Sequence, residues 1–100
     1  MSEITTTIGL GSRKVQSGTA AMTTALIAAG AAGATVTVAA PGVLATDIVN
    51  FSFNASPGAN PGVLKVNAWP TTDNVNFAFV NPTAAGVTPA ASTLNWQVTR

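Results

Sequence analysis

Strict alternation of apolar and polar residues recurs along the chain from about residue 35 to the C-terminus. Because successive side chains of a strand point to opposite faces of a sheet, this period of two predicts strands rather than helices. The five segments that carry the alternation are 35–38, 49–54, 64–69, 74–79 and 94–99. Each has one apolar face and one face of Asn, Thr or Ser, which is typical of antiparallel sheets with one buried face.

Glycine and proline separate these segments, and two Pro-Gly pairs mark 55–62 as the clearest loop. Short strands at regular spacing predict an all-β fold, namely an antiparallel β-sandwich of jelly-roll-like type. The chain of 100 residues has the length of one domain and no linker that would divide it. We therefore predict an extended N-terminal arm over 1–14 and a single β-sandwich domain over 15–100.

The first third of the chain leaves two alternatives open. The Ala-rich segment 19–29 has helix propensity, but Thr23 and Thr24 lower it and Gly30 and Gly33 close the segment. We favour an irregular or extended strand over a short helix. The arm itself is either a frayed terminus or a segment that docks on a neighbouring molecule.

Residues 15–46 contain no charged side chain, which raises the question of a membrane span or a secretory signal. Large apolar residues are sparse in this stretch and Pro41 interrupts it, so a membrane span is not expected. The basic pair Arg13 and Lys14 lies too late in the chain for an ordinary signal peptide. We expect the chain to remain whole and soluble, without a membrane partner.

Charge is scarce along the whole chain: only 7% of residues are charged, and the formal net charge is +1. This balance argues against binding of nucleic acid driven by electrostatics. The absence of Cys and His removes disulfides and the common zinc, iron–sulfur and haem ligands, so we expect neither metal nor cofactor. A surface with so little charge is a solubility liability, and we infer that copies of the chain or a larger assembly cover it.

The candidates for acid–base chemistry are few. Glu3 lies in the predicted arm, while Asp47 and Asp73 fall at the starts of predicted strands, where the usual task of Asp is to cap a turn. Without His, only Lys14 and Lys65 could activate a hydroxyl nucleophile. We therefore predict that the protein is not an enzyme.

The two tryptophans differ in their predicted environment. Trp96 shares an apolar face with Leu94 and Val98, which predicts a core position. Trp69 falls on the face opposite Leu64, and it either caps the edge of the core or marks a subunit interface, where Trp is enriched. With Lys65 on the same face, Trp69 is the candidate for contact between subunits.

From about residue 34 onward the layout resembles that of small structural proteins of tailed bacteriophages. The resemblance rests on Val-Leu-Lys-Val-Asn-Ala-Trp at 63–69, Asp-Asn-Val-x-Phe-x-Phe-x-Asn-Pro-Thr at 73–83 and Ala-Ala-Ser-Thr-Leu-Asn-Trp-Gln-Val at 90–98. It implies a capsid decoration (cement) protein or a module of a head or tail fibre, and the short length favours decoration. Such proteins commonly form trimers on the outer capsid surface.

The expected function is accordingly that of a virion structural protein, made in the host cytoplasm. We expect it to self-associate, as a homotrimer, and to bind the major capsid protein, with no nucleic acid. The residues expected to contact the capsid are Ile4, Ile8, Leu10, Arg13 and Lys14. The alternative is a receptor- or carbohydrate-binding module of a tail fibre or head fibre, in which exposed Asn, Thr and Trp69 would face a sugar.

Overall fold

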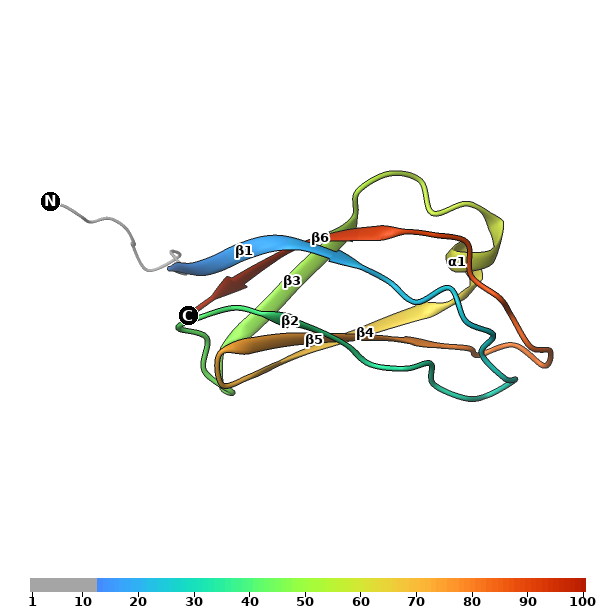
Figure 1. Ribbon diagram of the computed structural model, residues 1–100, viewed down its shortest axis with the longest axis horizontal. Helices are drawn as coiled ribbons and strands as arrows, with labels where there is room; N and C mark the ends of the chain where they lie inside the picture. The colour runs from blue at the N-terminus through green and yellow to red at the C-terminus, as the bar shows by residue number, and fades with distance from the viewer. Residues whose placement is uncertain (1–12) are drawn as a thin grey trace, which may run out of the picture.

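The structure is a computed structural model that describes residues 13–100. The described part contains six strands and one helical turn, coloured along the chain in Figure 1. The elements are β1 (Lys14–Ala21), β2 (Val36–Ala39), β3 (Ile48–Phe53), α1 (Ala59–Val63), β4 (Lys65–Thr71), β5 (Asn74–Val80) and β6 (Thr93–Thr99). Every segment for which the alternation predicts a strand is a strand here.

Two antiparallel sheets of three strands each form the body, in the orders β1-β6-β3 and β2-β5-β4. They pack face to face as two layers (Figure 1), which confirms the predicted all-β sandwich. Backbone hydrogen bonds of 3.0 and 2.9 Å join Arg13 and Arg100 in both directions. The start of β1 and the C-terminal residue therefore lie side by side, at one end of the sandwich.

The central strands β5 and β6 supply the middle of the core. Val75, Phe77 and Phe79 of β5 are fully buried and face Leu94 and its neighbours on β6 across the layers. Trp96 is 5% exposed and belongs to this core, as predicted. Burial of each large apolar side chain contributes about 1.5–3 kcal/mol, so the alternation in these two strands accounts for much of the stability.

Strand β1 is the element that the alternation does not reveal. Its sequence, KVQSGTAA, has small residues on both faces. The inward face of β1 packs on the neighbouring strand instead, because Gly18 lies opposite Trp96 in the β1–β6 ladder. After β1 the chain runs without regular structure to β2, with isolated bridges at Ile27 and Ala32. The Ala-rich segment is thus irregular and extended, and the helical alternative is wrong.

Three local features refine the expected loops and strands. The Pro-Gly segment predicted as a loop contains the helical turn α1. Strand β4 continues through Pro70, which lacks a backbone donor, and this is tolerated because β4 is an edge strand. In the tight turn between β4 and β5, Asp73 has a φ of 63°, a left-handed conformation that Asp adopts more readily than most residues.

Candidate functional site

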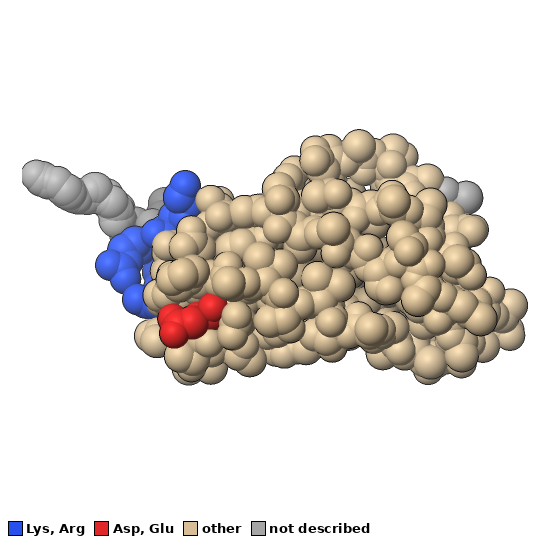
Figure 2. Space-filling model, in the orientation of Figure 1, with Lys and Arg blue, Asp and Glu red and all other residues tan. Residues whose placement is uncertain are grey.

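Five of the six charged side chains of the described residues gather at one end of the molecule. Figure 2 shows them as a single blue and red cluster beside the start of β1, with the rest of the visible face uncharged. The members of this charged end are Arg13, Lys14, Asp47, Asp73 and Arg100. Lys65, at the start of β4, is the one other charged residue within 13–100.

A two-point ion pair organises the charged end. Arg100 donates from Nε to Oδ1 of Asp47 and from Nη2 to Oδ2, both at 2.9 Å. The Leu44 backbone N–H also donates to the Asp47 carboxylate at 2.9 Å. These hydrogen bonds, with the bond from Arg100 the larger cause, lower the pKa of Asp47 to about 2. In return, Asp47 raises the pKa of Arg100.

Both described acids hold turns, as predicted for Asp at strand starts. Asp47 closes the 44–47 turn, since its own N–H donates to the Leu44 carbonyl while its carboxylate receives the Leu44 N–H. Asp73 accepts a hydrogen bond of 3.0 Å from the Gly42 N–H. Arg100 reaches the Gly42 carbonyl at 2.9 Å, so one network ties together the turns and the C-terminal strand.

The residues predicted to contact the capsid divide into two groups. Ile4, Ile8 and Leu10 lie outside the described residues. Arg13 and Lys14 belong to the charged end: Arg13 is paired with Arg100 through its backbone, and Lys14 begins β1. The last two residues of the predicted arm are therefore part of the sandwich, and the side chains of both are exposed.

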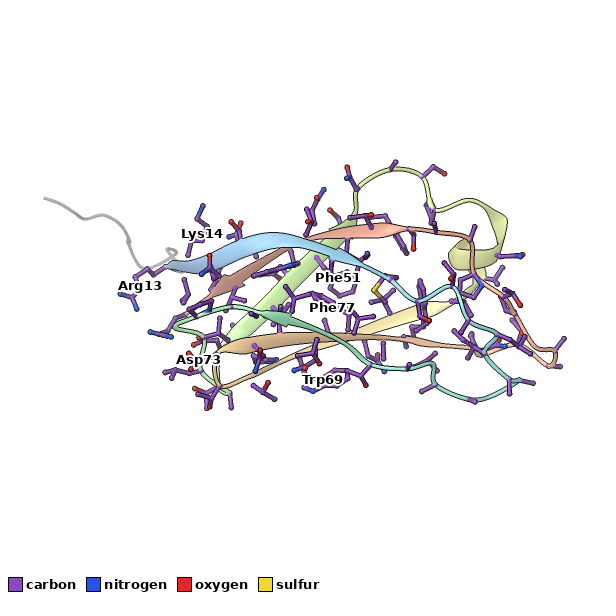
Figure 3. All side chains as sticks on the ribbon, in the orientation of Figure 1. Arg13, Lys14, Phe51, Trp69, Asp73 and Phe77 are labelled. Atoms are coloured by element: carbon purple, nitrogen blue, oxygen red, sulfur yellow. The ribbon has the colours of Figure 1, made fainter. Side chains whose placement is uncertain are left out.

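The candidate interface residues Trp69 and Lys65 share the outer face of the β2-β5-β4 sheet. Trp69 is 38% exposed and points away from the core in Figure 3. Beside it in the ladder, Asn76 donates to the Trp69 carbonyl at 3.1 Å and accepts from the Thr37 hydroxyl at 2.9 Å. This buried amide fixes the backbone beneath Trp69, so the indole is presented on a rigid strand.

The outer face of the opposite sheet was not singled out from the sequence. Across β1, β6 and β3, two rows of neutral polar residues lie side by side on this surface. We call it the amide face; its members are Ser17, Thr19, Asn50, Ser52, Asn95 and Gln97. The unusual presence of Asn within strands is the sequence feature that points to this face. The rows themselves follow only from the pairing of β1 with β6.

The end of the sandwich opposite Arg100 is made of loops (Figure 1) that one asparagine holds together. Asn81 is fully buried, and its Nδ2 donates to the carbonyls of Ile27 and Ala85 at 3.0 and 2.8 Å. Its Oδ1 accepts from the Thr83 N–H and hydroxyl. Leu26, 67% exposed, adds a large apolar side chain to the surface of this end.

Within residues 13–100 there is no group of three or more acidic, His or Cys side chains placed to hold a metal ion. The same part of the chain has no helix of the length and hydrophobicity needed to span a bilayer. Comparison with protein-family models, with curated proteins and with solved structures found no match. The surfaces of the fold itself are therefore what point to a function.

Proposed function

We propose that this protein is a non-enzymatic virion component, a decoration protein that binds the outer capsid surface as a homotrimer. The observation that carries the proposal is the distribution of charge: five of the six charged residues within 13–100 lie at one end. Both sheet faces and the opposite end are almost neutral. Such a surface favours contact with neighbouring molecules over free solution, where charge keeps proteins apart.

The charged end is the part that we propose faces the shell. Residues 1–12 join the sandwich there, next to Arg13, and a stretch of twelve residues spans at most about 40 Å. In the proposed complex Ile4, Ile8 and Leu10 bind apolar sites on the major capsid protein. Arg13 and Lys14 add charge complementarity, which governs orientation and association rate more than affinity.

Stabilisation of the shell follows from mass action. A protein that binds only the assembled, expanded shell stabilises that state by an amount that grows with its concentration relative to Kd. Three attachment segments in one trimer make each later contact intramolecular, so that weak single contacts give tight binding overall. Catalysis plays no part in this function, since the Asp47 and Asp73 carboxylates are engaged in turns.

The test is addition of the purified protein to expanded shells of the cognate major capsid protein, followed by sedimentation of the shells. We expect saturable binding and a higher shell melting temperature. A chain that begins at Arg13 should fold but bind at least tenfold more weakly. Undiminished binding by this shortened chain would overturn the role of residues 1–12.

A matched pair of charge changes tests the orientation. Lys14→Gln at the charged end and Thr88→Glu in an exposed loop far from it each lower the net charge by one. Only Lys14→Gln should slow association with the shell. Copy number per virion distinguishes the fibre alternative, because decoration requires hundreds of copies whereas a fibre tip is present in a handful.

A further inference from the structure

The amide face has an ordered arrangement across three strands. Ser17, Gln97 and Asn50 form one row and Thr19, Asn95 and Ser52 form the next, as fixed by the β1–β6 and β3–β6 registers. Neighbouring strands lie about 4.8 Å apart, so each row spans about 10 Å. The result is a flat, uncharged field of carboxamides and hydroxyls on a rigid sheet.

The polar groups of this face are free to bind a ligand. None of the six side chains hydrogen-bonds another residue within the described part of the chain. An open groove of about 310 Å³ runs between β3 and β6, lined by Asn50, Ser52, Asn95 and Gln97 together with Phe51 and Trp96. This volume is at the lower end of the range for ligand sites. The side chains of Phe51 and Trp96 point to the core side of the sheet, so the groove is polar on its open side.

Chemistry distinguishes the occupants that such a surface could take. The core of a protein interface is rich in aromatic residues and poor in Ser, and each buried polar group there needs a partner. Of the exposed large apolar residues, Ile48 lies on this face, at the start of β3 and beyond the two polar rows, whereas Leu26 and Trp69 lie at the loop end and on the opposite sheet. A sugar, by contrast, presents hydroxyls that both donate and accept, which matches carboxamides and hydroxyls group for group.

We propose that the amide face binds a neutral glycan, with the side-chain amides of Asn50, Asn95 and Gln97 hydrogen-bonding its hydroxyls. The site lies on the sheet opposite Trp69, which differs from the tryptophan-centred sugar site considered from the sequence. It requires no metal ion and no charge. The proposal is independent of the decoration function, because a soluble copy of the protein would bind the glycan equally well.

The experiment is a nuclear magnetic resonance titration of the ¹⁵N-labelled full chain with glucose, galactose, mannose and N-acetylglucosamine, each up to 100 mM. Heparin serves as a charged control. We expect at least one neutral sugar to shift the side-chain amide signals of Asn50, Asn95 and Gln97, while heparin leaves them unchanged. Absence of these shifts with all four sugars, or shifts centred on Trp69, would overturn the proposal.

A matched pair of variants excludes a general effect on the fold. Asn95→Val and Asn67→Val each remove an exposed strand amide, on the amide face and on the opposite sheet respectively. Asn95→Val should weaken sugar binding at least tenfold, and Asn67→Val should leave it unchanged; equal effects would contradict the site. Shifts of the same signals on tenfold dilution without sugar would show that a second copy covers the face, and this too would overturn the proposal.

Discussion

Gly18 leaves the space that the Trp96 indole occupies on the neighbouring strand. A Cβ added at Gly18 would lie 2.8 Å from Cζ2 and 3.2 Å from Cε2 of Trp96. Trp96 cannot move away, because it is buried in the core between the two sheets. The pair therefore fixes the position of β1 against β6. Strand β1 has no hydrophobic alternation that would fix it.

Gly18→Ala should accordingly destabilise the protein by about 1–3 kcal/mol, the usual cost of overpacking a well-filled core. Urea unfolding followed by Trp96 fluorescence in a Trp69→Phe background measures the effect. The matched control is Gly62→Ala in α1, where the new Cβ meets only Pro57 at 4.0 Å. That control should lie within about 1 kcal/mol of the parent protein; equal losses in both variants would refute the role of the close approach.

Removal of the Asn81 side chain should loosen the loop end of the sandwich. Asn81→Ala leaves the Ile27 and Ala85 carbonyls and the Thr83 N–H without this partner. The two carbonyls keep the Val87 N–H and the Thr83 hydroxyl as donors, whereas the Thr83 N–H loses its acceptor. We therefore expect a loss of about 1–3 kcal/mol. Hydrogen exchange should rise at Gly30 and Val87 before it rises in β5. Asn54→Ala, at an exposed position, is the control and should change little.

Stability should fall in acid because of Asp47. The carboxylate has a pKa of about 2 in the folded protein and about 3.9 when unfolded, so its contribution is fully present above pH 4. It is lost as the pH falls from about 4 to about 2, because the unfolded chain then takes up the proton first. Asp47→Asn should flatten this part of the stability profile, measured by urea unfolding at several pH values. An unchanged slope would show that another carboxyl group is responsible.

Trp69→Thr should prevent the self-association that we propose, without unfolding the domain. Threonine suits a strand, and Asn76 still binds the backbone carbonyl at position 69. We expect sedimentation velocity to show a trimer for the parent protein and a monomer for the variant. Val63→Ser, which removes an apolar side chain that is 49% exposed, is the control and should remain trimeric. A variant that sediments like its parent would place the subunit interface elsewhere.

The sequence was informative wherever a residue faces the core. Alternation identified β2 to β6 and the inward position of Trp96 because burial of large side chains leaves a period of two. It could not identify β1, whose place depends on the Trp96 ring above Gly18, a contact between residues 78 positions apart. Asn81 follows the last apolar position of β5, and only the folded loops show that its side chain binds the carbonyls of Ile27 and Ala85.

The surfaces were harder to predict than the core. The alternation within each strand shows that Asn50 and Asn95 face outward. It does not show that Asn50 pairs with Gln97 and Asn95 with Thr19 on the adjacent strands. Register depends on which strands pair. Strand β1, which the alternation does not reveal, supplies one of the three residues in each row. The ion pair between Asp47 and Arg100 was missed for the same reason, since 53 residues separate the two partners.

The backbone pairing of Arg13 with Arg100 has a practical consequence for anything fused to this chain. A tag or reporter added after Arg100 emerges beside the attachment point of residues 1–12, where it would compete for space with whatever they contact. The loops at the far tip of the sandwich lie away from this end (Figure 1). For display on a particle, an internal insertion is thus the better design than a terminal fusion.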